Sequence, residues 1–137
     1  MTQQLQPVEA LIYAMVTAAA VDRKITEVEL SRISTLVSEL PVFRDLKGDW
    51  LSKEAQDCGR VLSKPEGVRR VLDLLKAALP KHLRETAYVL ATEVTISDLT
   101  VKEEETQFLS LLAEVLELDQ LVCAALHRAA RARHSTL

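Results

Sequence analysis

The sequence predicts a single all-α domain, and three observations support this fold class. Its length of 137 residues is close to the commonest size of one domain. The chain is 48% hydrophobic and 27% charged, with only 3 Gly, 4 Pro and few aromatic residues, and this composition favours helices over strands separated by frequent turns. A helix–elbow–helix unit also occurs twice, once around Asp22 and again around Asp98.

Composition and charge argue against several classes of protein. The net charge of −3 offers no overall attraction to a phosphate backbone, so we expect no nucleic-acid partner. Cys58 and Cys123 belong to no CxxC pair and are typical of core residues in a reducing, cytoplasmic protein. The apolar run 10–21 lacks a preceding Lys or Arg and is too short to span a bilayer, so neither a signal peptide nor membrane insertion is expected.

The first half of the chain predicts two helices joined by an elbow. Residues 1–6 are polar and predicted to be flexible, and Pro7 suits the first position of a helix. That helix should end near Asp22, with Leu11, Met15 and Ala18 facing inward. Thr26 and Glu29 have the spacing of a capping box, which predicts the start of a second helix ending at Pro41.

Beyond Pro41 the pattern is weaker before it becomes regular again. One short helix is expected over 50–60, and Pro65 is predicted to open an amphipathic helix that Pro80 closes. A helix over 82–97 and a second elbow follow. Thr100 and Glu103 form a second capping-box spacing, and Asp119 should cap a last helix. The end of that helix is basic, a placement that favours the helix dipole, and the residues concerned are His127, Arg128, Arg131, Arg133 and His134.

The two elbows align at an offset of 76 residues, which predicts an internal repeat with halves of about 8–43 and 82–119. Carboxylates and apolar residues recur together at this offset. Helical periodicity alone does not dictate matched carboxylates at an elbow. The matched pairs are Asp22 and Asp98, Ile25 and Val101, Glu27 and Glu103, Glu29 and Glu105, Ile33 and Leu109, Leu36 and Leu112, and Leu40 and Leu116.

This elbow pattern resembles that of the tellurite-resistance TerB family and its TerB-like relatives. Asp22, Ile25 and Glu29 match the family's elbow, as do the equivalent residues at 98, 101 and 105, whereas the family's elbow glycine is Arg23 in one copy and Leu99 in the other. The resemblance implies one TerB-like bundle of about seven helices over 7–134. It also implies a role in tellurite or chemical-stress response, with the elbow acids binding a divalent cation and the domain serving as a scaffold.

The residues themselves leave two interpretations of the elbows open. Asp22, Glu29, Asp98 and Glu105 are candidate ligands for a hard cation such as Ca²⁺ or Mg²⁺. A true EF-hand is excluded, because the residues at its first two ligand positions are apolar: Ala18 and Ala20 in one copy, Val94 and Ile96 in the other. Alternatively, the acids only cap helices, with Glu29 and Glu103 in capping boxes.

No nucleophile and base occur at a recognisable catalytic spacing, so a non-enzymatic protein is expected. The first hypothesis is a TerB-like module, in a stress-related setting, that binds a divalent cation or a protein partner through its acidic elbows. A homo-oligomer is the alternative to a separate protein partner. The alternative is a purely structural or adaptor domain whose elbow acids only cap helices.

Overall fold

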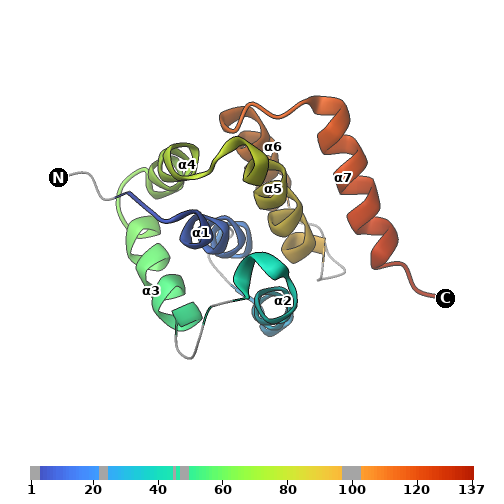
Figure 1. The fold of residues 1–137 in the computed structure, drawn as a ribbon, viewed down its shortest axis with the longest axis horizontal. Helices are drawn as coiled ribbons and strands as arrows, with labels where there is room; N and C mark the ends of the chain where they lie inside the picture. Colours follow the sequence, from blue (N-terminus) through green and yellow to red (C-terminus); the bar gives the residue numbers. More distant parts are fainter. Residues whose placement is uncertain (1–3, 22–24, 45, 47–49, 97–102) are drawn as a thin grey trace.

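The computed structural model confirms the all-α prediction and contains seven α-helices and one short 3₁₀ helix among the residues it describes (Figure 1). These residues are 4–21, 25–44, 46, 50–96 and 103–137, and they include no strand. In the same ranges, no helix has the length and apolarity needed to cross a membrane. The helices are α1 (Pro7–Ala20), α2 (Glu27–Glu39), η1 (Pro41–Phe43), α3 (Trp50–Leu62), α4 (Gly67–Ala78), α5 (Lys81–Ile96), α6 (Glu103–Val115) and α7 (Gln120–Arg133).

Three helix starts have the first-turn proline or the capping residue that the sequence predicts. α1 begins at Pro7, and the Gln6 amide donates to Glu9 Oε1 at 2.7 Å. α2 begins after Thr26 with the predicted capping box. α7 begins after Asp119, whose Oδ1 accepts from the Leu121 amide at 3.3 Å. Side chains at these three helix ends therefore satisfy backbone donors that have no partner within the helix.

The prediction that Pro65 opens the fourth helix is wrong by two residues. Glu66 has a left-handed backbone, with φ 56° and ψ 38°. A residue in this conformation cannot be part of a right-handed helix, so α4 starts at the next residue, Gly67. The helix predicted near 50–60 is present as α3, and η1 was not predicted. Leu5, within the segment predicted to be flexible, is buried against the core.

The centre of the core is α1, which is buried on every side. All ten residues from Ala10 to Ala19 are buried, although the sequence analysis expected a smaller set of inward residues. α1 packs against α2, α3, α4, α5 and α6, and its most extensive packing is against α5 (Figure 1). Small side chains allow two helix backbones to approach closely, and both helices supply buried alanines: Ala10, Ala14, Ala18, Ala19, Ala87 and Ala91.

Helix limits and burial correspond at the offset of 76 residues. α2 and α6 both contain 13 residues, and their first residues are Glu27 and Glu103. α1 ends at Ala20 and α5 ends at Ile96. Several equivalent residues are buried in both halves: Glu29 and Glu105, Ile33 and Leu109, Leu36 and Leu112. These matches agree with an internal repeat, which stays a prediction because it requires that the two halves superpose.

A glycine lies where α4 starts close to the end of α3. A Cβ atom added to Gly67 would lie 2.6 Å from Leu62 Cα and 2.7 Å from Leu62 C, so the obstacle is backbone and not a movable side chain. Gly59, inside α3, has no such neighbour within 4 Å.

We expect Gly67→Ala to lower the free energy of unfolding by about 1–3 kcal/mol, because α3 and α4 must separate to admit the methyl group. Gly59→Ala is the matched control and should raise it by about 0.5–1 kcal/mol, because alanine favours an exposed helix position. Urea denaturation followed by circular dichroism measures both variants. Equal effects of the two substitutions would contradict the assigned close approach.

Candidate functional site

The structure describes two of the four predicted cation ligands. Asp22 and Asp98 lie outside the described residues. Glu29 lies in the first turn of α2 and Glu105 in the first turn of α6, and each is only 1% exposed. A glutamate is rarely buried to this extent unless its charge is compensated, so these two equivalent residues are the strongest part of the predicted site.

One carboxylate oxygen of Glu29 is used in capping. Its Oε1 accepts from the Thr26 amide at 3.0 Å and from Thr26 Oγ1 at 3.2 Å. In return, the Glu29 amide donates to Thr26 Oγ1 at 3.1 Å. The first predicted capping box is therefore confirmed.

The other carboxylate oxygen of Glu29, Oε2, takes no part in capping. Glu29 Oε2 is buried and has no hydrogen-bond partner among the residues that the structure describes. Buried polar atoms nearly always have a partner, so an atom of this kind calls for an explanation. Capping explains Oε1 and leaves Oε2 unexplained.

In the second half, the buried glutamate is not the one predicted to cap. Glu103 is exposed, and its Oε1 accepts from Gln107 Nε2 at 3.4 Å. Its predicted partner Thr100 lies outside the described residues, so the second capping box stays a prediction. Within the described ranges, no three Asp, Glu, His or Cys side chains come together as a metal site. A cation at either elbow would therefore need ligands beyond Glu29 and Glu105.

A charged cluster at Glu93 was not predicted from the sequence. This residue lies near the end of α5 and is 1% exposed. Its Oε1 lies 2.7 Å from Arg133 Nη1, and its Oε2 lies 3.0 Å from His134 Nε2. The basic tail of α7 was attributed to the helix dipole, but two of its residues reach this buried carboxylate. The sequence signal was present only as a glutamate inside an apolar helix.

A second missed feature is the carboxyl group of Glu54, which is 4% exposed between α3 and α1. Burial, followed by a hydrogen bond and charge repulsion from Glu9, raises the pKa of Glu54 to about 7. The pKa of the neighbouring Tyr13 phenol is raised as well. Burial, followed by the charges of Cys58 and Glu54, raises it to about 12. The interface between α1 and α3 therefore favours the protonated form of Glu54.

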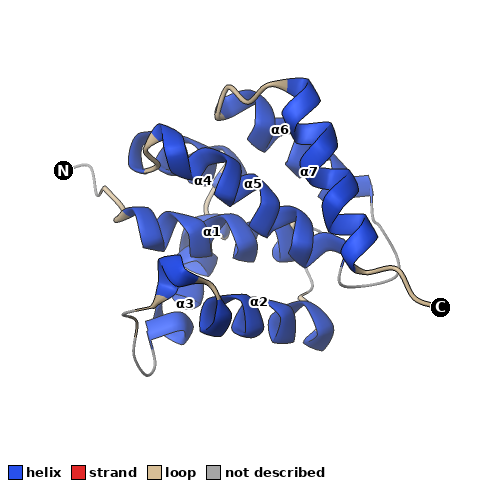
Figure 2. Cartoon of the chain, turned by 45° about the vertical axis from the view of Figure 1, so that its right-hand side comes forward, coloured by secondary structure: helices blue, strands red, loops and turns tan. Residues whose placement is uncertain are grey.

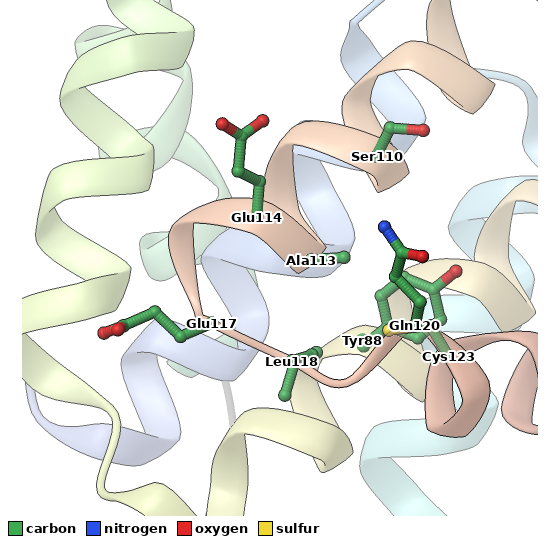
Figure 3. Close-up of a pocket in the computed structure, with 8 residues that line it drawn as sticks. All are labelled: Tyr88, Ser110, Ala113, Glu114, Glu117, Leu118, Gln120 and Cys123. Atoms are coloured by element: carbon green, nitrogen blue, oxygen red, sulfur yellow. The ribbon is translucent and has the colours of Figure 1, made fainter.

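A hollow of about 550 Å³ lies where α5, α6 and the start of α7 meet (Figure 3). Tyr88 and Cys123 lie close together on one side of it, whereas Glu114 and Glu117 point away from them (Figure 3). Burial, followed by the charges of Asp119 and Glu85, raises the pKa of the Cys123 thiol and so disfavours its nucleophilic thiolate form. The titratable groups of this hollow thus do not converge on one point.

Comparisons of the chain with protein-family models, with curated proteins and with solved structures found no match. The resemblance to the TerB family therefore rests on the elbow residues of the sequence.

The raised pKa of Glu54 predicts a stability that depends on pH. The folded state favours the neutral carboxyl, so this contribution is present below about pH 4.5 and is lost as the pH rises through about 7. We expect the free energy of unfolding to fall by on the order of 2 kcal/mol between pH 5 and pH 8 relative to Glu54→Gln, because one pKa unit is about 1.4 kcal/mol.

Urea titrations at pH 5, 6, 7 and 8 measure this difference. Glu39→Gln serves as the control because Glu39 is exposed and lies on another helix. If wild type and Glu54→Gln have parallel pH profiles, the carboxyl of Glu54 is not protonated in the folded state.

Proposed function

We propose that this protein is a TerB-like, non-enzymatic helical module that binds a divalent cation through its acidic elbows, in a tellurite or chemical-stress response. The observation that supports cation binding is the state of Glu29 Oε2. This atom is buried and lacks a hydrogen-bond partner among the described residues. A carboxylate left in this state loses its hydration without a compensating contact. A bound cation would supply that contact.

The chemistry of the elbow suits a hard cation. Ca²⁺ and Mg²⁺ prefer carboxylate and carbonyl oxygens, and Glu29 keeps one oxygen available while the other holds the helix start. Asp22, seven residues before Glu29 in the sequence, would supply a further ligand. Glu105 is buried to the same degree at the equivalent place, with Asp98 seven residues before it, so we propose the same role for the second elbow.

We also propose a cellular location and a kind of partner for this protein. We place it in the cytoplasm, where both thiols would stay reduced, and both cysteines are free in the fold. We also propose that the cation-bound elbows contact a protein partner or a second copy of the chain, and that nucleic acid is not a partner, since the net charge is negative.

Calorimetric and thermal-shift titrations with Ca²⁺, Mg²⁺, Mn²⁺ and Zn²⁺ test the cation. A cation at 100 times its dissociation constant should stabilise the wild type by about 2.7 kcal/mol. Glu29→Gln should weaken binding because it keeps the capping acceptor and removes the charge. Glu27→Gln is its control, because Glu27 is exposed in the same turn, and Glu104→Gln is the corresponding control for Glu105→Gln.

An unchanged melting temperature and no heat with all four ions would remove the cation from the proposal. Equal binding by Glu29→Gln, Glu105→Gln and the wild type would place the cation elsewhere on the protein.

The capping box of α2 favours a second candidate function, a purely structural or adaptor domain. Both Thr26 donors are held by Glu29 Oε1, and the Glu29 amide is held by Thr26. A side chain with this role needs no ligand to account for its position. In that case the elbow acids determine where helices start, and any partner binds elsewhere on the surface.

Thr26→Ala tests the structural contribution of the cap. We expect a loss of about 1 kcal/mol in the free energy of unfolding, because the Glu29 amide loses its acceptor and Thr26 Oγ1 is removed. Thr35→Ala is a suitable comparison, because Thr35 lies in the interior of the same helix. A Thr26→Ala variant as stable as Thr35→Ala would show that the box contributes nothing. If Thr26→Ala lowers the free energy of unfolding and no ion binds, the structural function is favoured over cation binding.

A further inference from the structure

We propose that α7 is a detachable C-terminal helix, fastened to α5 by Glu93, that opens while the rest of the bundle stays folded. This inference concerns a different part of the fold from the elbows and does not depend on cation binding.

α7 has little buried surface for a helix of its length. Of its 14 residues, only Cys123 and Ala130 are buried. It packs chiefly against α5, and it lies on the outside of the bundle, away from α2, α3 and α4 (Figures 1 and 2). α1, by contrast, packs against five helices. Segments with few buried apolar contacts open at a lower free energy than the core, so α7 is the helix best suited to separate first.

Beyond the buried Ala130, two contacts with Glu93 hold the C-terminal end of α7. Arg133 is the last residue of α7 and His134 follows it, and each lies within 3.0 Å of one carboxylate oxygen of Glu93. Glu93 is 1% exposed, so its charge is removed from water when α7 is docked. Breaking an ion pair by removing one partner of a buried charge is strongly destabilising. The carboxylate therefore acts as the fastening point for α7.

The opposite end of α7 is anchored to the bundle by its connection to α6. Glu117 in this connection has a left-handed backbone, φ 58°, which turns the chain between the two helices. Its Oε1 lies 3.5 Å from Lys76 Nζ and 3.8 Å from Arg84 Nη1, and Arg84 Nη1 also donates to the Leu116 carbonyl at 3.3 Å. These contacts hold the connection in place while α7, from Gln120 to the end that Glu93 fastens, moves away from α5.

Opening would uncover the face of α5 beneath α7. Tyr88 on α5 and Cys123 on α7 are both buried, line the same hollow (Figure 3) and interact electrostatically. The thiol of Cys123 therefore reports on the separation of α7 from α5. Cys58 is 0% exposed and its thiol contacts α1, with Sγ 3.5 Å from Thr17 Oγ1, so it reports on opening of the central core.

The rates at which N-ethylmaleimide modifies Cys123 and Cys58, followed by mass spectrometry of peptides, test the inference in the full chain. We expect Cys123 to react at least about tenfold faster than Cys58, because it needs only local opening. Arg133→Gln with His134→Gln should raise the Cys123 rate by about a further tenfold, the equivalent of about 1.4 kcal/mol in the opening equilibrium, and leave the Cys58 rate unchanged.

The matched control is Arg128→Gln with Arg131→Gln, which removes two cations from the same end of α7. Like Arg133, Arg131 lies in the last turn and interacts with the helix dipole, but neither Arg128 nor Arg131 takes part in the contacts of Glu93. Equal increases at Cys123 in both double variants would contradict the role of Glu93. Equal increases at Cys58 and Cys123 would show that α7 separates only when the whole bundle unfolds. An unchanged Cys123 rate in Arg133→Gln with His134→Gln would show that the contacts of Glu93 do not fasten α7.

Discussion

The arrangement of this bundle depends on the complete burial of α1. Ten consecutive residues without exposed surface require neighbours on every side, and five other helices provide them. The alanines of α1 and α5 make this possible, because their small side chains let the two helices pack closely. Since α2 follows α1 and α6 follows α5, the first turns of α2 and α6 also lie against buried surface. The burial of Glu29 and Glu105 is a consequence.

The buried glutamates differ in how their charge is compensated. Glu93 is paired with Arg133 and His134, which fastens the last helix. Glu54 shares its surroundings with Glu9 and has a pKa of about 7, so much of its charge is removed by protonation near neutral pH. Glu29 uses one oxygen to cap α2 and leaves the other without a described partner. Removing charge from water is costly in every case, and only the last case suggests an external cation.

Helical periodicity, proline positions and capping residues predicted most helices and their limits, because these signals act within one or two turns of the chain. The start of α4 was misplaced because Pro65 is permitted in a first turn, whereas the left-handed backbone of Glu66 depends on how α3 ends against Gly67. The offset of 76 residues matched Glu29 with Glu105 and also the exposed Glu27 with Glu103, so it could not tell which of these acids are buried. The cation-binding role of Glu29 and Glu105 stays a prediction.

By itself, the sequence determined the fold class and the order of the helices, because local propensity and spacing suffice for these properties. Only the tertiary structure decided which glutamates lose contact with water. Glu93 and Glu54 are ordinary polar residues in their own helices, and their burial results from packing against segments 30 or more positions away, α7 and α1. Desolvation is a property of the assembled bundle, so it is not encoded in any single segment.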